Sequence, residues 1–183
     1  MPQVSPETGI ISLEKNCPIQ HIHSGTDTPR IKTSDLEDDA SLLGGGFTSK
    51  SRAYLNGNQS VATGAEKLIE LETESYDIDG EFDTTSHLFT ATTAGYYYVG
   101  AAVWIDAQTA DKQYSVSIFK NATRACRTIV HSSHVQNLAP SVSSVIYLAA
   151  SDTVSLYMGH NEAGNINAVA GEGSTYLSIH RLS

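Results

Sequence analysis

The stretch HLFTATTAGYYYVGA, residues 87–101, decides the fold class. Two runs in and beside it, residues 87–91 and 96–105, are rich in aromatic and β-branched side chains, which favour β-strands. Alternate residues of a strand point to opposite faces, so Tyr96, Tyr97 and Tyr98 cannot all be exposed. At least one of these tyrosines is therefore expected in the core.

The same period of two recurs elsewhere in the chain. Apolar side chains alternate with Ser or Tyr at residues 114–118 and 154–158. Further strands are expected at residues 67–71, 125–131, 142–148 and 175–182, separated by turn-rich pieces. No stretch shows a capped helical pattern. The sequence therefore predicts an all-β protein, a sandwich or jelly roll of eight to ten short strands.

The charge balance excludes one broad class of function. The chain has 183 residues, 20 acidic and 11 basic, with a formal net charge of −9. Recognition of nucleic acid or of an anionic membrane needs a basic face, so we expect no nucleic-acid partner. No segment approaches the roughly 20 apolar residues of a membrane span, so no membrane insertion is expected. The opening residues lack the features of a secretory signal, and we expect synthesis in a cytoplasm.

The composition changes near residue 46. Residues 1–46 hold four prolines, no aromatic residue and the acidic run 37–39, so they cannot bury a core as a monomer. Gly44-Gly45-Gly46 follows and is typical of a hinge or a tight crossing. We therefore predict an extended N-terminal attachment and trimerisation segment at residues 1–46 and a globular head at residues 47–183.

A spaced pattern of apolar and aromatic residues identifies a family resemblance. Its positions are Leu71, Asp77, Phe82, Phe89, Gly95 and Tyr97. This pattern resembles the signature of the C1q-like domain, in which aromatics are spaced to an Asn or Asp and then to Gly-x-Tyr. Leu71 stands where the family usually has Phe, and Val99 and Ala101 replace its final aromatics. The alternative is a generic β sandwich.

The resemblance extends from about Ser51 to Leu182. It implies a ten-stranded jelly roll of the C1q and tumour-necrosis-factor type that forms a homotrimer. In such a fold Phe89 and Tyr97 are expected in the core, and Gly95 is expected at a turn or close approach that a Cβ would obstruct.

The N-terminal segment contains HIHSGTDTPRI, residues 21–31. This text resembles a segment that recurs in the attachment regions and shafts of bacteriophage tail proteins. In an extended chain His21 and His23 share a face, so in a parallel trimer three such pairs converge on the axis. Six imidazole nitrogens suit an octahedral divalent transition metal, iron or a similar ion, better than tetrahedral zinc. The alternative is that both histidines are solvated and bind no metal.

Three other motifs carry residue types that can take part in metal binding, catalysis or glycosylation. Asp77, Asp79 and Asp83 surround a glycine and offer oxygen ligands to calcium, although a structural turn is the favoured interpretation. His131-Ser132-Ser133-His134 places hydroxyls beside histidines but has no nucleophile elbow, and we expect no catalysis there. Asn121-Ala122-Thr123 matches a glycosylation acceptor and is interpreted as a hairpin turn.

These features together favour a non-enzymatic, homotrimeric virion structural protein. We expect a short phage fibre or tip protein, attached to other virion proteins through the N-terminal segment, whose head binds a host cell-surface glycan with avidity. The alternatives are a capsid decoration protein and a secreted bacterial C1q-like adhesin. The binding residues are unknown, and turn chemistry suggests the loops Asn56–Gln59, Asp106–Lys112 and His160–Asn167.

Overall fold

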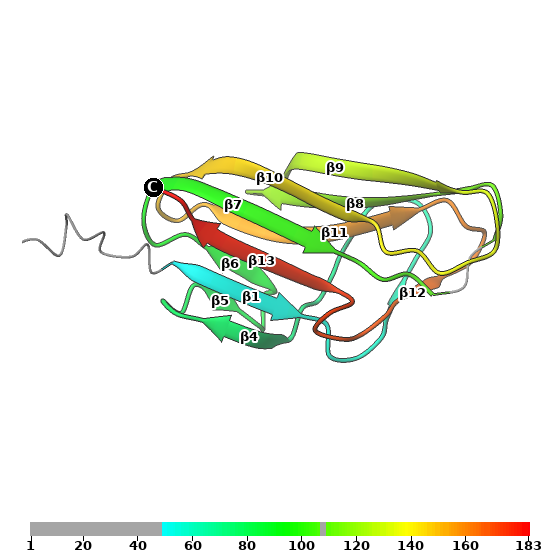
Figure 1. Ribbon diagram of the computed structural model, residues 1–183, viewed down its shortest axis with the longest axis horizontal. Helices are drawn as coiled ribbons and strands as arrows, with labels where there is room; N and C mark the ends of the chain where they lie inside the picture. The colour runs from blue at the N-terminus through cyan, green and yellow to red at the C-terminus, as the bar shows by residue number, and fades with distance from the viewer. Residues whose placement is uncertain (1–48, 107–108) are drawn as a thin grey trace, which may run out of the picture. The chain divides into compact units, whose positions relative to one another are not determined.

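The computed structural model describes residues 49–106 and 109–183, and this part of the chain is all-β (Figure 1). It contains thirteen strands rather than the ten expected, because five of them are only two or three residues long. The strands are β1 (Lys50–Tyr54), β2 (Gln59–Val61), β3 (Lys67–Leu68), β4 (Thr73–Asp77), β5 (Phe82–Asp83), β6 (Leu88–Thr90), β7 (Gly95–Ala102), β8 (Lys112–Lys120), β9 (Thr123–Ser132), β10 (Ser141–Leu148), β11 (Thr153–His160), β12 (Ile166–Ala168) and β13 (Tyr176–Arg181).

The strands form two sheets that pack face to face, with a small two-stranded ribbon at one end (Figure 1). The first sheet has the order β10-β7-β13-β1-β4. The second has the order β5-β6-β11-β8-β9, with β3 paired to β11, and the ribbon joins β12 to β2. All pairings between these strands are antiparallel. The arrangement is a jelly-roll-like sandwich, as the sequence predicts.

The core lies between the two sheets and is built from alternate residues of each strand. Tyr97 and Val99 of β7, Val116 of β8 and Leu156 of β11 are fully buried. Tyr96 and Tyr98 are exposed, so one of the three consecutive tyrosines is in the core, as predicted. Burying an aromatic or large aliphatic side chain stabilises the fold by about 1.5–3 kcal/mol, which makes β7 a principal contributor to the sandwich.

The positions of the family pattern have structural roles. Leu71 and Phe89 are fully buried, so the replacement of the usual Phe at residue 71 is accommodated by packing. Asp77 Oδ2 accepts a hydrogen bond of 2.8 Å from the backbone N–H of Phe82, which closes the turn between β4 and β5. A Cβ on Gly95 would meet the Ser183 carbonyl group and lie 2.8 Å from Arg181 Nε. Gly95 therefore permits the close approach that the pattern implies.

All eight strand segments expected from the sequence contain a strand, but five strands were not foreseen: β1, β2, β4, β5 and β12. β4 contains no fully buried residue, so it lacks the apolar alternation that predicts a half-buried strand. β2, β5 and β12 are too short for a period to be recognised. These strands are set by pairing with distant partners, which local sequence does not reveal.

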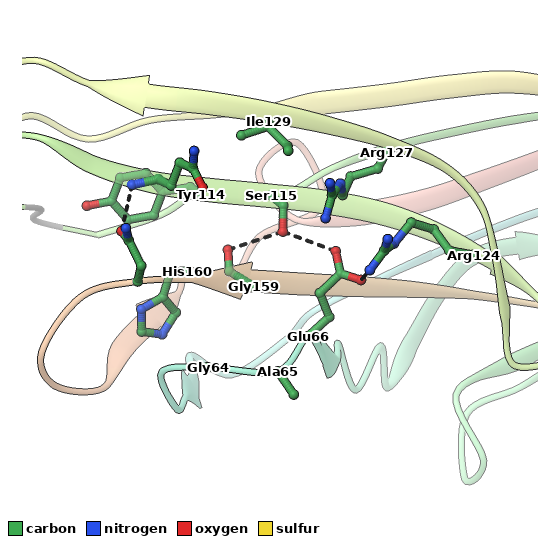
Figure 2. A pocket seen from close by; sticks show the side chains of 12 residues that line it. Gly64, Ala65, Glu66, Tyr114, Ser115, Arg124, Arg127, Ile129, Gly159 and His160 are labelled. Atoms are coloured by element: carbon green, nitrogen blue, oxygen red, sulfur yellow. Dashed lines mark hydrogen bonds and ion pairs between the residues drawn. The ribbon is translucent and has the colours of Figure 1, made fainter.

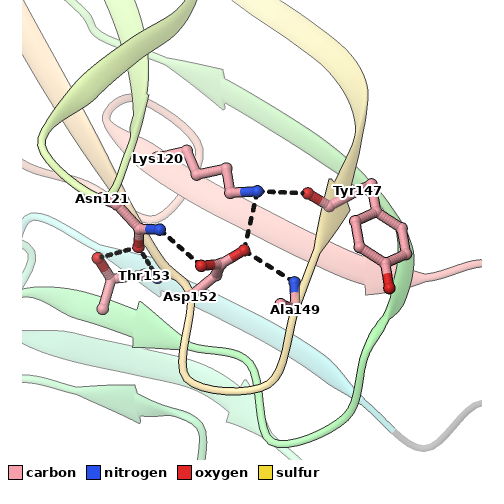
Figure 3. Close-up of polar contacts among 6 residues, drawn as sticks. All are labelled: Lys120, Asn121, Tyr147, Ala149, Asp152 and Thr153. Atoms are coloured by element: carbon pink, nitrogen blue, oxygen red, sulfur yellow. Dashed lines mark hydrogen bonds and ion pairs between the residues drawn. The ribbon is translucent and has the colours of Figure 1, made fainter.

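Asn121 and Ala122 form the two-residue turn between β8 and β9. Both have positive φ, 48° and 62°, which matches the handedness of a tight hairpin and confirms the turn interpretation of this stretch. The Asn121 side chain extends the turn across to the loop between β10 and β11. Its Oδ1 accepts a hydrogen bond of 2.8 Å from Thr153 N, and its Nδ2 donates one of 2.5 Å to Asp152 Oδ1 (Figure 3).

Asp152 is the centre of this polar contact (Figure 3). Its Oδ2 lies 2.8 Å from Lys120 Nζ and accepts a hydrogen bond of 2.8 Å from Ala149 N. Lys120 Nζ also donates to the Tyr147 carbonyl oxygen at 2.8 Å. The hydrogen bonds from Lys120, Asn121 and Ala149 lower the pKa of Asp152 from 3.8 to about 2. The contact therefore joins two connections that close the same end of the sandwich.

The structure describes residues 49 onward, so the predicted boundary at residue 46 and the extended N-terminal segment stay predictions. Among the described residues, no helix has the length and apolar character to cross a membrane.

Asp152→Asn is expected to lower the melting temperature at neutral pH, with an effect that disappears in acid. A carboxyl group whose folded pKa is depressed contributes stability above its unfolded pKa, and that stability is lost as the pH falls through the folded value. The gap in melting temperature between parent and variant should therefore narrow between about pH 5 and pH 2. Thermal denaturation followed by circular dichroism measures the melting temperatures of parent and variant at each pH. The gap in melting temperature between the parent and Lys120→Met should narrow over the same pH range. A gap that stays constant over this range would contradict the assignment.

Candidate functional site

An exposed patch of large apolar side chains lies on the outer face of the first sheet, on strands β7 and β10. Tyr96 and Tyr98 of β7 are 54% and 43% exposed, and Val145 and Tyr147 of β10 are 53% and 51% exposed. The two strands are adjacent, with Tyr98 opposite Val145 and Tyr96 opposite Tyr147. We call these four residues the tyrosine face.

The rings of the tyrosine face are held in defined positions. Tyr96 and Tyr147 meet edge to face, with their ring centroids 5.5 Å apart. The Tyr98 ring lies over Gly100, where a Cβ would come within 3.1 Å of the tyrosine hydroxyl oxygen. Gly100 therefore leaves room for Tyr98 to lie along the sheet. The result is a preorganised aromatic surface.

Polar and aromatic side chains continue this surface across β13, β1 and β4. The Arg52 guanidinium lies 3.8 Å from the centroid of the Tyr176 ring, a cation–π contact. His180 Nε2 is 3.0 Å from the Tyr76 hydroxyl and 3.2 Å from Ser178 Oγ. Burial, together with the charge of Lys50, lowers the pKa of His180, so the imidazole is neutral at physiological pH.

A hollow of about 590 Å³ adjoins the tyrosine face. Its lining includes Tyr98, Tyr176, Ser178 and residues 126–128 of β9. A hollow beside an exposed aromatic surface provides a recess for side chains of another chain. The hollow and the tyrosine face together have the geometry of a contact surface.

The three loops suggested by turn chemistry lie at one end of the sandwich. Thr109 N donates a hydrogen bond of 2.7 Å to Glu162 Oε1, which joins the second loop to the third. Asn58 Oδ1 accepts one of 2.8 Å from Ala170 N, and the β2–β12 ribbon joins the first loop to the third. In Figure 1 this end, marked by β12, is opposite the end at which β1 begins and the chain terminates. The structure therefore gathers residues far apart in sequence into one cluster.

Glu162 anchors this loop cluster from within. Its side chain is buried and accepts hydrogen bonds from the Tyr114 hydroxyl and from Thr109 N. Burial alone would raise the pKa of Glu162, but these hydrogen bonds hold it below its usual value. Burial and the adjacent carboxylate raise the pKa of Tyr114, which stays protonated and donates. The pair therefore acts as a structural anchor for the loop cluster.

The other predicted site residues are placed as follows. His21 and His23 lie outside the described residues, so the axial metal site stays a prediction. Asp83 accepts hydrogen bonds from Thr85 N and Ser86 Oγ, both at 2.8 Å, and acts as a turn carboxylate. No group of three or more potential metal ligands gathers within residues 49–106 and 109–183, so the geometry gives the calcium hypothesis at Asp77, Asp79 and Asp83 no support.

Within residues 131–134, both serines contact His134, whereas His131 is directed elsewhere. Ser132 is buried and donates to the His134 carbonyl oxygen, and Ser133 Oγ lies 2.9 Å from His134 Nδ1. His131 Nε2 is instead 3.2 Å from the Gln113 side chain. These contacts stabilise the end of β9.

Comparison with known proteins finds one family model, described as the C1q domain, that matches residues 53–177. A search of curated protein sequences finds no match. Several solved structures are similar in fold at low sequence identity.

The first such structure is Eiger TNF from S. frugiperda, with 12% identity, a TM-score of 0.59 and coverage of 73% of this chain and 92% of that one. The globular domain of zebrafish complement 1qA protein has 12% identity, a TM-score of 0.54 and coverage of 74% and 98%. Murine APRIL has 11% identity, a TM-score of 0.55 and coverage of 73% and 99%.

Proposed function

The chain belongs to the C1q domain family, and from this premise we propose that it is a non-enzymatic binding protein that forms a homotrimer through the tyrosine face. The observation that carries the proposal is the cluster of four half-exposed apolar side chains on β7 and β10. Tyrosine is enriched at protein interfaces because it supplies a large apolar area with a polar hydroxyl. A contiguous exposed patch of this kind marks an interaction surface.

The position of the patch supports self-association. It lies on the outer face of the first sheet, whereas the loop cluster lies at one end of the sandwich. Three copies that meet through this face leave three identical loop clusters accessible. A multivalent head of this kind converts weak single contacts into strong attachment.

Replacing Tyr98 and Val145 with Asp is expected to convert the trimer to a monomer. The two positions are opposite each other on β7 and β10, so the variant places paired carboxylates in each interface, where desolvation and repulsion disfavour association. Size-exclusion chromatography with light scattering measures the mass. Ile78→Asp, at an exposed apolar residue outside the tyrosine face, should stay trimeric. A parent protein that is a monomer at micromolar concentration would refute the proposal.

At a finer level, we propose that the protein is a virion component, a short phage fibre or tip protein whose head binds a host cell-surface glycan. The support is the tail-protein resemblance of residues 21–31 and the multivalent presentation of the loop cluster. Its other partners are virion proteins that bind the N-terminal segment. A capsid decoration protein is the second candidate, because the same trimer shape suits a cap on a symmetry axis; a secreted adhesin is the third.

Adsorption of particles to host cells separates these roles. Asn56→Arg combined with Ala163→Arg alters two exposed loops while leaving the anchors Asn58 and Glu162 in place. We expect at least a tenfold loss of adsorption with unchanged particle assembly, because bulky charges obstruct the recognition surface (about 1.4 kcal/mol per tenfold). Ile78→Arg, at the opposite end, serves as the control. Normal adsorption, together with a weakened shell when the protein is deleted, would favour the decoration role.

We further propose that His21 and His23 hold one divalent transition metal on the trimer axis. The support is their i, i+2 spacing, which places both side chains on one face of an extended chain. Metal binding would then supply the free energy that orders three segments without a core.

Elemental analysis of protein purified without a metal-affinity step is expected to show about one metal ion per trimer. Chelation, acidification through the histidine range, or His21→Ala with His23→Ala should each make residues 1–46 sensitive to protease while the head stays folded. Metal-free protein whose double variant resists proteolysis as well as the parent does would show that these histidines are not ligands.

A further inference from the structure

A separate pocket lies on the outer face of the second sheet, the sheet that does not carry the tyrosine face (Figure 2). Its volume is about 290 Å³. The lining comes from the loop before β3 and from strands β8, β9 and β11. Four segments distant in sequence therefore meet in a recess close to the smallest volume typical of small-molecule sites, about 300 Å³.

Glu66 lines one side of this pocket. Its side chain reaches across β11 at Gly159, where a Cβ would lie 2.9 Å from Glu66 Cγ. Glu66 Oε1 accepts a hydrogen bond of 3.1 Å from Ser115 Oγ (Figure 2) and one of 2.5 Å from Ser117 Oγ. Gly159 therefore provides the space through which the carboxylate enters the pocket.

The charge of Glu66 is neutralised inside the pocket. Arg124 donates to Glu66 Oε2 through both Nε, at 3.0 Å, and Nη2, at 2.6 Å. Burial alone would raise the pKa of Glu66, but the hydrogen bonds from Ser117, Arg124 and Ser115 hold it below its usual value. The carboxylate is therefore ionised and already paired, and Arg124 is committed to it.

A second arginine lines the same pocket and is not committed. Within residues 49–106 and 109–183, Arg127 has no hydrogen-bond or ion-pair partner, and no dashed line reaches it in Figure 2. In a chain with a net charge of −9, an unpaired guanidinium in a recess is a local site of positive potential. Its planar donor fork matches a carboxylate in two parallel hydrogen bonds.

The remaining lining residues offer hydroxyl recognition and an apolar contact. Asn161 Oδ1 accepts a hydrogen bond of 2.7 Å from Gln113 N, and Gln113 Nε2 lies 3.2 Å from His131 Nε2. The Asn161 Nδ2 donor and the Gln113 Oε1 acceptor are therefore the amide groups left for sugar hydroxyls. Ile129 is 42% exposed and supplies an apolar surface for the C–H groups of a ring. His160 is not available to a ligand, because its Nε2 is bonded to the Val61 carbonyl oxygen and its Nδ1 accepts from Glu162 N.

We propose that this pocket binds a single acidic sugar residue, a pyranose bearing a carboxylate, with Arg127 pairing the carboxylate and the Gln113 and Asn161 amides pairing ring hydroxyls. The inference rests on the proposed glycan-binding function and adds the chemical class of the ligand and a second location, away from the loop cluster. The pocket is on the other sheet from the tyrosine face, and Arg127 of its lining also borders the hollow beside that face.

The arrangement of charge favours a carboxylate over a phosphate group. One guanidinium is available, which balances a single negative charge, whereas a doubly charged phosphate would leave excess charge beside the Glu66 carboxylate. A neutral sugar would displace water from the Arg127 guanidinium without giving it a charged partner, and this would lower the affinity. An anionic ring therefore satisfies more of the lining than either alternative.

Titration of the full-length protein followed by NMR or calorimetry tests the proposal, with methyl glucuronide, methyl glucoside and inorganic phosphate as probes. Methyl glucuronide is expected to bind, and Arg127→Gln should weaken it about tenfold or more, the loss typical of a charged hydrogen-bonded pair. Glu66→Gln should strengthen it several-fold, because the amide keeps the serine hydrogen bonds while removing a negative charge and releasing Arg124. Lys67→Gln, which removes a charge outside the pocket lining, is the matched control.

Weaker binding in Arg127→Gln and stronger binding in Glu66→Gln together separate a ligand-binding role from a structural role. A loosened pocket would weaken binding in both variants. Equal binding of the glucoside, binding of phosphate alone, an unchanged Arg127→Gln variant, or no binding of any probe would each overturn the acidic-sugar site. None of these results bears on the trimer or on particle adsorption. The proposed function is judged by the light-scattering and adsorption measurements, so the two can fail independently.

Discussion

The alternation of side chains along β7 is the constraint on which the rest of the structure depends. Tyr97 and Val99 point into the sandwich and are fully buried, whereas Tyr96 and Tyr98 point out. β7 lies between β10 and β13, so a shift of one residue in its register would expose the core tyrosine and bury the outer pair. The same eight residues thus specify both the packing of the head and its candidate contact surface.

The fold was largely predictable from local sequence because its long strands are half-buried and alternate. Residues 114–118 and 154–158 show the period of two and became the centres of β8 and β11. β4 was missed because its polar side chains, including Glu74 and Ser75, show no apolar alternation. It pairs with β1 residues 19 to 26 positions earlier in the chain. Pairing of this kind is a tertiary property, and no window of local sequence contains it.

The candidate sites were less predictable than the fold. The tyrosines of β7 indicated a core residue, but the exposed pair forms a face only because Val145 and Tyr147 of β10 lie opposite. Glu66 and Arg124 are 58 residues apart, and their contact depends on the absence of a side chain at Gly159. A single glycine in a strand carries no local signal of what crosses it, so only the assembled sheet reveals this pocket.

The hydrogen bonds that join the loop cluster run from backbone N–H groups to side-chain oxygens. Thr109 N and Ala170 N make the joining hydrogen bonds, and Glu162 and Asn58 receive them, while Asn56 and Ala163 are exposed and do not take part. The outer side chains of these loops are therefore free to diversify without unfolding the frame that holds them. A point substitution at one of these outer positions can thus change the surface that the loops present without removing a joining hydrogen bond.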